Sequence, residues 1–316
     1  MSSSSSVPAR GVRIHWDDIP SEVRTALERR LGARVVEATT QPGGFSPGLA
    51  ARLLLANSTR VFLKAVHESA NPDTPDIHRR EARIVAALPT TAPVPRLLWS
   101  YDEGGWVALC FEDIEGRHPS EPWAADDLTL VIDALKTMAT ALTPAPIDAG
   151  ATAADAIRTT INGWQLADRR RETRLDPWAL RHLGRLAELE AGAADASAGD
   201  TLLHFDVRAD NVLIAGRRVY VVDWPWARTG AAWVDWVAMA PSVAMQGGPD
   251  PESFLRRFDI REISPPAIDA VLCAIAGYFV VHALDPPPRG LPTVRDFQAA
   301  QGRVAIAWLQ RRLGWD

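Results

Sequence analysis

The sequence predicts an α+β protein with a small β-rich N-terminal lobe and a larger, mostly α-helical C-terminal lobe. Short apolar segments of strand length, separated by glycine-rich or polar turns, fill residues 33–113. Helix-length patterns dominate after Gly116, and one strand-like pair at 201–223 interrupts them. The chain has 316 residues and is 47% hydrophobic, which is enough for a substantial core. The expected divisions are a disordered tail, an N-terminal lobe and a C-terminal lobe, over residues 1–12, 13–113 and 114–316.

The N-terminal lobe is expected to hold two helices and five strands. The first helix covers 17–32 and ends at Gly32. A second helix over 74–88 has Pro75 in its first turn. The expected strands lie at 33–41, 49–56, 61–66, 96–102 and 106–113.

The C-terminal lobe is expected to be helical apart from the pair at 201–223. Its longest apolar run, at 270–281, is too short to span a bilayer and predicts a buried core helix. The helical patterns lie at 123–142, 151–172, 176–193 and 230–245, and again from 251 to the end.

Composition excludes several classes of function. The net charge of −5 and the pI of about 5.8 argue against a nucleic-acid partner and suit small cationic partners better. The first ten residues lack an apolar segment, so we expect neither a signal peptide nor a membrane partner. Cys110 and Cys273 fit no metal or redox spacing, which favours a reduced, cytoplasmic setting. The sequence does not predict an oligomeric state.

Lys64 is a charged residue inside an apolar strand. By alternation it shares a face with Phe62 and Val66. A strongly hydrated ammonium in such a position needs a partner, unless the strand lies at a sheet edge and the lysine points to solvent.

Glu81 is the matching anomaly in the helix over 74–88. It follows Ile77 by four residues and precedes Ile84 by three, so it lies on the apolar face of that helix. A carboxylate in an apolar stripe is usually paired. Lys64 is one candidate partner, and a neighbouring arginine is the alternative.

The segment 42–48 is a glycine-rich loop between two expected strands. Gly43, Gly44 and Gly48 allow the backbone to approach an anion closely, so its N–H groups can bind phosphates. Many hairpin loops contain three glycines, however, and no Walker A pattern follows.

The strongest pattern is a set of polar residues at the tips of apolar segments. It reads His204-x-Asp206-x₄-Asn211, and Asp223 ends the next strand. At a loop tip, Asp206 can accept the proton of an attacking hydroxyl, and His204 is expected to be a buried group that braces the loop. On two sides of a hairpin, Asn211 and Asp223 can hold Mg²⁺ against nucleotide phosphates.

These residues carry a resemblance to a known family. Their order resembles the protein-kinase-like superfamily, and the aminoglycoside phosphotransferase and choline kinase branch most closely. HFDVRADNVLI at 204–214, followed by VVDWPWA at 221–227, is similar to that branch's His-Gly-Asp…Asn-Val-Leu…Ile-Asp-Trp signature. The segment GAAWVDWVAMA at 230–240 fits as well, and the resemblance covers about residues 35–245.

The resemblance implies a bilobal protein-kinase-like fold that binds ATP and Mg²⁺ in the cleft. By position, Lys64 holds the α- and β-phosphates and Glu81 orients it. Asp206 is the catalytic base, and Asn211 and Asp223 are the metal ligands.

The resemblance also implies supporting residues. Asp235 braces the catalytic loop from the following helix, together with His204. The hinge is the segment 111–116, where the backbone of Glu112 and Ile114 meets adenine. The nucleotide loop supplies Gly43, Gly44, Ser46 and Gly48.

Three departures from the family pattern are visible. Phe205 replaces the glycine usual in the catalytic loop, which predicts a reshaped loop. Trp224 and Pro225 follow the metal aspartate in place of the more usual residues. The nucleotide loop contains two prolines and lacks a clean G-x-G-x-x-G.

The leading functional hypothesis is an ATP-dependent phosphotransferase that moves the γ-phosphate to a hydroxyl of a small molecule. A catalytically silent nucleotide-binding module is the main alternative, although such proteins usually lose one of these residues. A protein Ser/Thr kinase is disfavoured, because only 11 residues separate Asp223 from Asp235 and no Ala-Pro-Glu follows. A two-metal phosphoesterase lacks further ligands.

The acceptor is the least defined part of the hypothesis. Four acidic residues in the C-terminal lobe can hold the ammonium groups of an aminoglycoside or an amino alcohol. Interleaved arginines favour the alternative, which is an ordinary solvated surface. These acidic residues are Asp250, Glu252, Asp259 and Glu262.

Overall fold

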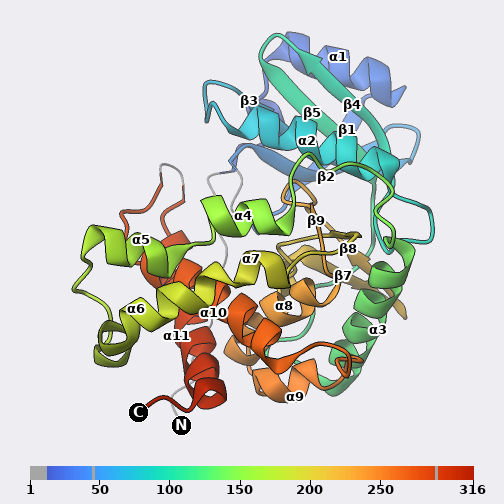
Figure 1. The fold of residues 1–316 in the computed structure, drawn as a ribbon. Coiled ribbons are helices and arrows are strands. Elements are labelled where there is room, and N and C mark those ends of the chain that lie inside the picture. Colours follow the sequence, from blue (N-terminus) through green and yellow to red (C-terminus); the bar gives the residue numbers. More distant parts are fainter. Residues whose placement is uncertain (1–12, 45–46, 289–290) are drawn as a thin grey trace.

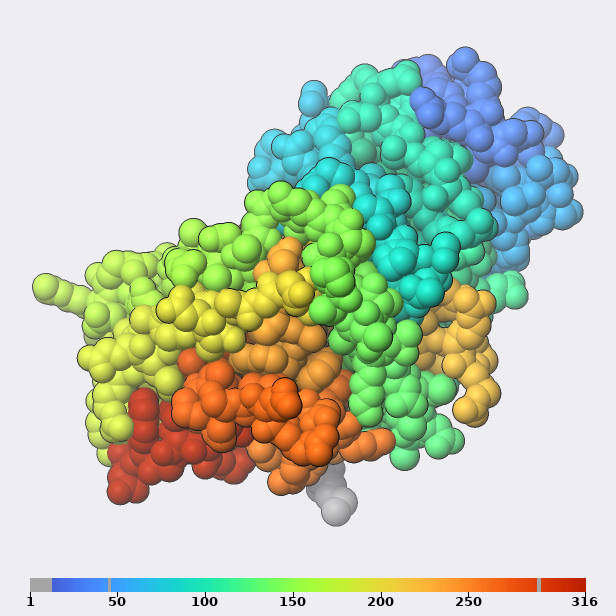
Figure 2. All heavy atoms as spheres, turned by 45° about the vertical axis from the view of Figure 1, so that its right-hand side comes forward, coloured from blue at the N-terminus to red at the C-terminus, as the bar shows by residue number. Residues whose placement is uncertain are grey.

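The described part of the chain, residues 13–44, 47–288 and 291–316 of a computed structural model, has two regions of different secondary structure. A five-stranded antiparallel sheet with its helices forms the N-terminal region, and a larger helical region follows (Figure 1). In Figure 2 the N-terminal region, in blue to blue-green, lies above the helical region and adjoins it. The predicted α+β class and two-lobed arrangement are confirmed, whereas the expected tail at 1–12 lies outside the described residues.

The N-terminal sheet has the strand order β1-β2-β3-β5-β4, and all neighbouring strands are antiparallel. All five expected strands are present. They are β1 (Val35–Thr40), β2 (Leu49–Leu55), β3 (Arg60–His67), β4 (Leu97–Glu103) and β5 (Trp106–Glu112). The helices of this region are the 3₁₀ turn η1 (Trp16–Asp18), α1 (Ser21–Leu31) and α2 (Thr74–Ala87).

Alternation along β5 separates the two faces of this sheet. Cys110 packs with Leu27 of α1 in one apolar cluster, whereas Leu109 and Phe111 pack with Ile84 of α2 in another. The second cluster continues into the helical region. The face of the sheet that carries α2 is therefore the face that meets the C-terminal lobe.

The C-terminal region keeps the expected helices with two changes. Residues 151–172 form two helices, because the chain bends to bring Gly163 against α10, where a Cβ would lie 2.0 Å from the carbonyl oxygen of Gly277. The helix expected from 230 begins at Trp233, because the preceding residues pair with β6. The helices are α3 (Ala125–Ala141), α4 (Ala153–Thr159), α5 (Gly163–Arg170), α6 (Pro177–Ala191), α7 (Ala193–Ala196), α8 (Trp233–Met245), α9 (Pro251–Leu255), α10 (Pro265–His282) and α11 (Val294–Leu313).

Two small antiparallel ladders lie between the helices and carry the loops of the predicted site. In the first, β6 pairs with β9, and in the second β7 pairs with β8. A 3₁₀ turn, η2, leads into β7. These elements are β6 (Thr201–Leu203), η2 (Ala209–Asn211), β7 (Val212–Ala215), β8 (Arg218–Val221) and β9 (Arg228–Gly230).

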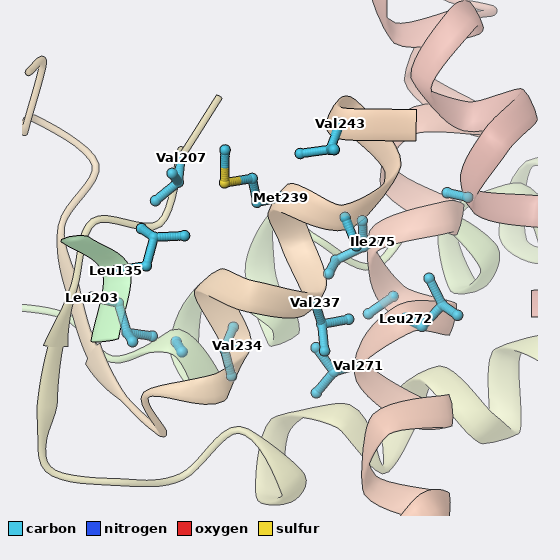
Figure 3. Close-up of a cluster of buried hydrophobic side chains, with 14 of the residues drawn as sticks. Leu135, Leu203, Val207, Val234, Val237, Met239, Val243, Val271, Leu272 and Ile275 are labelled. Atoms are coloured by element: carbon cyan, nitrogen blue, oxygen red, sulfur yellow. The ribbon is translucent and has the colours of Figure 1, made fainter. Parts of the chain in front are cut away.

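The core of the helical region surrounds α10 and reaches the predicted catalytic loop. Of the described helices, α10 alone is long and apolar enough to span a bilayer, but 56% of its apolar window is buried inside the protein. It packs against α5, α6, α7, α8 and α11, so the predicted core helix is confirmed. Figure 3 shows this core extending from Val271 through α8 to Leu203, which leads into the loop, and Val207, which lies within it.

Candidate active site

Lys64 and Glu81 meet where the sheet faces α2. The Lys64 Nζ donates to both carboxylate oxygens of Glu81, at 2.7 and 3.0 Å. It also donates to Asp223 Oδ1 at 2.8 Å, which links the sheet to the second lobe. The predicted pairing is confirmed, and both alternatives, a solvent-facing lysine and a local arginine partner, are wrong.

The charges of this cluster stabilise one another. Burial lowers the pKa of Lys64, but the carboxylates of Asp223 and Glu81 more than offset this, so the pKa lies above its ordinary value. Burial alone would raise the pKa of Asp223, but the charge of Lys64 lowers it to about 2. The lysine therefore stays cationic and Asp223 stays anionic near neutral pH.

The catalytic loop follows β6 and is fixed by one buried carboxylate. Asp235, in the first turn of α8, accepts the backbone N–H of His204 at 2.8 Å and that of Phe205 at 2.9 Å. Phe205 has a φ of +67°, a left-handed conformation that favours glycine. Phenylalanine therefore occupies a backbone conformation that favours glycine, and the two hydrogen bonds to Asp235 help to hold it there.

His204 is wholly buried inside this loop. Its Nε2 donates to the carbonyl of Val222 at 2.9 Å, and its Nδ1 accepts the backbone N–H of Asp206 at 3.2 Å. The Trp224 ring packs edge-on against it, with the centroids 4.7 Å apart. Burial lowers the pKa of His204 to about 4, so it stays neutral and links the loop to the strand end near Asp223.

Asp206 lies at the tip of the loop beside Asn211. The Asn211 side-chain N–H donates to the Asp206 carbonyl at 2.8 Å and to its carboxylate at 3.3 Å. Arg208 lies 3.5 Å from the same carboxylate and forms two 3.1 Å hydrogen bonds with Asp210. Burial raises the pKa of Asp206 to about 7, although the charge of Arg208 opposes this shift. No pattern in the sequence assigns a role to Arg208.

Asn211 and Asp223 lie on the two sides of the β7–β8 hairpin, as predicted. The Val222 N–H donates to the Asn211 carbonyl at 2.9 Å, which brings the two segments together. Asp223 has a φ of +71°, a strained conformation for a residue with a side chain. The Asn211 amide oxygen receives no hydrogen bond from any described residue, so it is available to a hard cation.

The glycine-rich loop packs on a residue that sequence analysis did not identify. Arg13 donates to the carbonyl of Gly43, and the Ile14 N–H donates to the carbonyl of Gly48 at 3.2 Å. Gly48 has a φ of +104°, and a Cβ there would lie 2.4 Å from the Ala65 carbonyl oxygen. No periodic pattern marks the segment around Arg13. Ser46, also predicted for this loop, lies outside the described residues.

The expected hinge leaves β5 and enters the helical region. Among the described residues, no hydrogen bond involves the backbone N–H of Ile114, while its carbonyl accepts the N–H of Gly116 at 2.8 Å. Asp113 is buried and accepts two bonds from Arg52, at 2.7 and 2.9 Å, and one from Arg60 at 3.1 Å. This ion cluster, also missed by sequence analysis, fixes the hinge to β2 and β3. The other predicted hinge residue, Glu112, accepts the backbone N–H of Arg96 at 2.9 Å through its side chain.

A lysine–glutamate pair in a β-rich lobe, facing an aspartate-bearing loop in a helical lobe, is the arrangement of the protein-kinase-like superfamily. Comparison with protein families is more specific. The model described as "Phosphotransferase enzyme family" matches residues 43–271, which is more than two thirds of the chain. The chain therefore belongs to that family. A search of curated proteins found no match to this chain.

Solved structures share the fold at low sequence identity. An aminoglycoside phosphotransferase, APH(4)-Ia, is 15% identical with a TM-score of 0.64, and the match covers 94% of this chain and 100% of that one. A choline/ethanolamine kinase family protein from Mesorhizobium loti is 15% identical with a TM-score of 0.63, covering 93% and 97%. Spectinomycin phosphotransferase APH(9)-Ia is 11% identical with a TM-score of 0.61, covering 90% and 97%. The whole described fold is thus kinase-like.

Proposed function

We propose that the protein transfers the γ-phosphate of ATP to a hydroxyl group of a small molecule. The observation that carries this proposal is the position of Asp206. Its carboxylate is half-buried at a loop tip and accepts a hydrogen bond from the Asn211 side chain at 3.3 Å, and the nearby charge of Asp223 raises its pKa. Family membership supports it, and so do two similar structures, one a complex with ADP and hygromycin B and the other a complex with ADP and spectinomycin.

In this proposal the N-terminal lobe, residues 13–113, binds the nucleotide. The free N–H of Ile114 and the backbone of Glu112 bind adenine, and the loop at 43–48 covers the phosphates. Lys64 turns its ammonium from Asp223 toward the α- and β-phosphates, while Glu81 holds it in place. The lysine remains protonated throughout, because it exchanges one anionic partner, Asp223, for another, the phosphates.

The C-terminal lobe, residues 114–316, provides the metal ligands and the base. Asn211 and Asp223 would hold Mg²⁺, which would supply positive charge at the phosphates when bound. No group of three or more His, Cys, Asp or Glu in the described part of the chain is placed to hold a metal ion. In this account phosphate oxygens and water would complete the coordination. Two oxygen ligands and a phosphate suit Mg²⁺, which keeps several waters.

Asp206 acts as the general base in this account. It accepts the proton of the attacking hydroxyl, and a pKa of about 7 suits that task near neutral pH. His204 and Asp235 act through the backbone, because they fix the loop that presents Asp206. Arg208 balances the charge at the loop tip and steadies the carboxylate.

The acceptor in this proposal is a hydroxyl compound. Three of the four acidic residues considered as partners for its ammonium groups already form contacts within the protein. Asp250 accepts the N–H of Ser253 at 3.1 Å, which caps α9. Glu252 pairs with Arg312 at 2.8 Å, and Asp259 pairs with Arg261 at 2.7 Å. These contacts support the alternative that such carboxylates serve the protein surface.

Competing functions have weaker support. A silent module would be expected to have lost a residue or its geometry, whereas the lysine, base and metal-ligand candidates are all brought together here.

Both cysteines are free and buried, which is consistent with a reducing cytoplasm.

A coupled ADP-release screen tests the proposal. The acceptors are aminoglycosides, macrolides, amino alcohols, sugars and nucleosides, with Mg²⁺ and ATP in excess. We expect at least one class to raise ADP release in the wild type and not in Asp206→Asn, with a phosphorylated product in mass spectrometry. ADP release that is equal in both proteins, or a product phosphorylated on a group other than hydroxyl, would contradict it.

A further inference from the structure

A cavity of about 750 Å³ opens on the C-terminal lobe, away from the Lys64–Asp223 cluster. It lies between the last turns of α3, the first turn of α8 and the segment that follows α9. In Figure 2 the orange segment and the green α3 adjoin on the lower part of the surface. The lining residues are Lys136, Ala139, Thr140, Trp236 and residues 256–261.

Two stacked aromatic rings form the apolar wall of this cavity. Trp236 and Phe258 are nearly parallel, with the centroids 4.5 Å apart and an angle of 13° between the planes. Phe254 packs edge-on against Phe258 at 5.4 Å, so the stack has support from α9. Trp236 is half-buried and leaves part of its ring accessible. Such a wall suits a flat ring that stacks or packs edge-on.

The rim of the cavity is cationic. Lys136 Nζ lies 5.8 Å from the centre of the Phe258 ring, and Arg257 reaches only the Thr129 hydroxyl, at 3.4 Å. Within residues 13–44, 47–288 and 291–316, neither side chain forms an ion pair. The one carboxylate of the lining, Asp259, is bound by Arg261. The cavity therefore presents positive charge beside an aromatic surface.

Both walls are directly joined to the supports of the catalytic loop. Leu135 precedes Lys136 and packs beside Leu203, which leads into that loop (Figure 3). Asp235 precedes Trp236 and accepts the two backbone N–H groups that fix the loop. A ligand that moves either wall thus acts on a residue that positions the base.

We propose that this cavity binds a small aromatic anion, a planar ring with a carboxylate, sulfonate or phosphate group, and that the occupied cavity changes the order of the catalytic loop. The ring packs on the Trp236–Phe258 stack and the anionic group binds Lys136 and Arg257. Binding here does not depend on the proposed phosphotransfer, because every contact lies outside the cleft.

The first test uses 8-anilinonaphthalene-1-sulfonate as the probe, with saturating ATP and Mg²⁺ to block the nucleotide cleft. Fluorescence titration compares the wild type with Lys136→Glu/Arg257→Glu. The matched control is Arg181→Glu/Arg303→Glu, which makes the same charge change at two exposed arginines elsewhere. We expect the cavity variant to bind the probe at least about tenfold more weakly than the wild type, because two charge contacts become repulsive. The affinity of the control variant should stay within about threefold of the wild type.

A second arm uses the neutral analogue N-phenyl-1-naphthylamine, which keeps the rings and lacks the sulfonate. It should bind the wild type weakly and should not distinguish the variants. Equal probe affinity in the wild type and the cavity variant, or an equal loss in the control, would overturn the site. Unchanged unfolding temperatures identify variants that have kept their fold.

Hydrogen exchange tests the link to the loop without an activity assay. The probe should change the exchange of the His204 and Phe205 amides in the wild type, and leave it unchanged in the cavity variant. Probe binding with no change at these amides would overturn the coupling. Loss of phosphotransfer in the screen above would not affect either result, so the two proposals fail independently.

Discussion

The two halves of the candidate active site hold their buried charges in different ways. On the sheet side, Lys64 lies between Glu81 and Asp223, and opposite charges neutralise one another across the cleft. On the loop side, Asp235 has no cation within the described residues and is held by two backbone N–H groups. The pKa values differ accordingly: Lys64 lowers that of Asp223 to about 2, whereas burial raises that of Asp235 to about 6.

This difference indicates that the charged partners on the sheet side can be exchanged, whereas the backbone on the loop side is fixed. An ion cluster can exchange a carboxylate for a phosphate with little change in backbone, because the lysine keeps an anionic partner. A carboxylate that binds consecutive N–H groups instead sets the path of the chain. Substitutions on the sheet side should therefore weaken nucleotide use, and substitutions on the loop side should displace the base.

The largest effect is expected at the tip of the loop. Asp206→Asn removes the proton acceptor but keeps the size of the side chain, so turnover should fall by about 10²-fold or more. ATP affinity, measured by calorimetry, should stay within a few-fold of the wild type. Turnover that is unchanged within a few-fold would exclude Asp206 as the base. The loop side of the site would then have no distinct role in the reaction.

Lys64 and Glu81 form the second test, as a four-member cycle. Lys64→Met should lower kcat/KM for ATP by roughly thirtyfold, as expected for loss of about 2 kcal/mol of charge-assisted contact. Glu81→Gln should show a milder loss, and the double variant should resemble Lys64→Met, because the shared interaction is already gone. Effects that simply multiply would mean that the two residues act independently.

Asp235→Asn is expected to act on the loop alone. An amide has one acceptor oxygen, and its NH₂ group opposes one of the two backbone N–H groups. We expect kcat to fall by about tenfold while KM for ATP changes little. A large rise in KM with unchanged kcat would place Asp235 on the nucleotide side of the comparison.

Glu190 provides the matched control for Asp235, because it is also a buried carboxylate that accepts two consecutive backbone N–H groups, at the start of α5. It is wholly buried on α6 and accepts the N–H groups of Trp164 and Gln165, at 3.1 and 2.9 Å. Glu190→Gln should leave kcat unchanged, since α5 carries none of the proposed site residues. A tenfold loss of kcat here would mean that the Asp235 effect is general destabilisation.

The buried Glu190 carboxyl should also make the free energy of unfolding depend on pH. Burial raises its pKa to about 7 from an ordinary value of 4.5, so the folded state binds the extra proton between these values. Its stabilising contribution is complete below pH 4.5 and is lost as pH rises to about 7, by on the order of 3 kcal/mol. Unfolding free energies at pH 5 and pH 8 should therefore differ less in Glu190→Gln. An unchanged difference would contradict the raised pKa.

Local patterns predicted the fold and several site residues, but not the contacts between lobes. Strand alternation and the helical face were enough to mark Lys64 and Glu81, because each breaks a short-range apolar pattern. The Lys64–Asp223 contact joins residues 159 positions apart, and no periodicity encodes it. The break near Gly163 likewise depends on its packing against Gly277, which only the folded chain reveals. The assigned chemical roles came from the family resemblance.

ATP binding measured by calorimetry with and without Mg²⁺ tests the central claim most directly, because it needs no acceptor. The wild type and Asp206→Asn should both bind ATP more tightly when Mg²⁺ is present. Asp223→Ala should lose that tightening, yet bind metal-free ATP at least as well as the wild type, because Lys64 is released from one carboxylate. Equal Mg²⁺ dependence in Asp223→Ala and the wild type would contradict the proposed metal and nucleotide site.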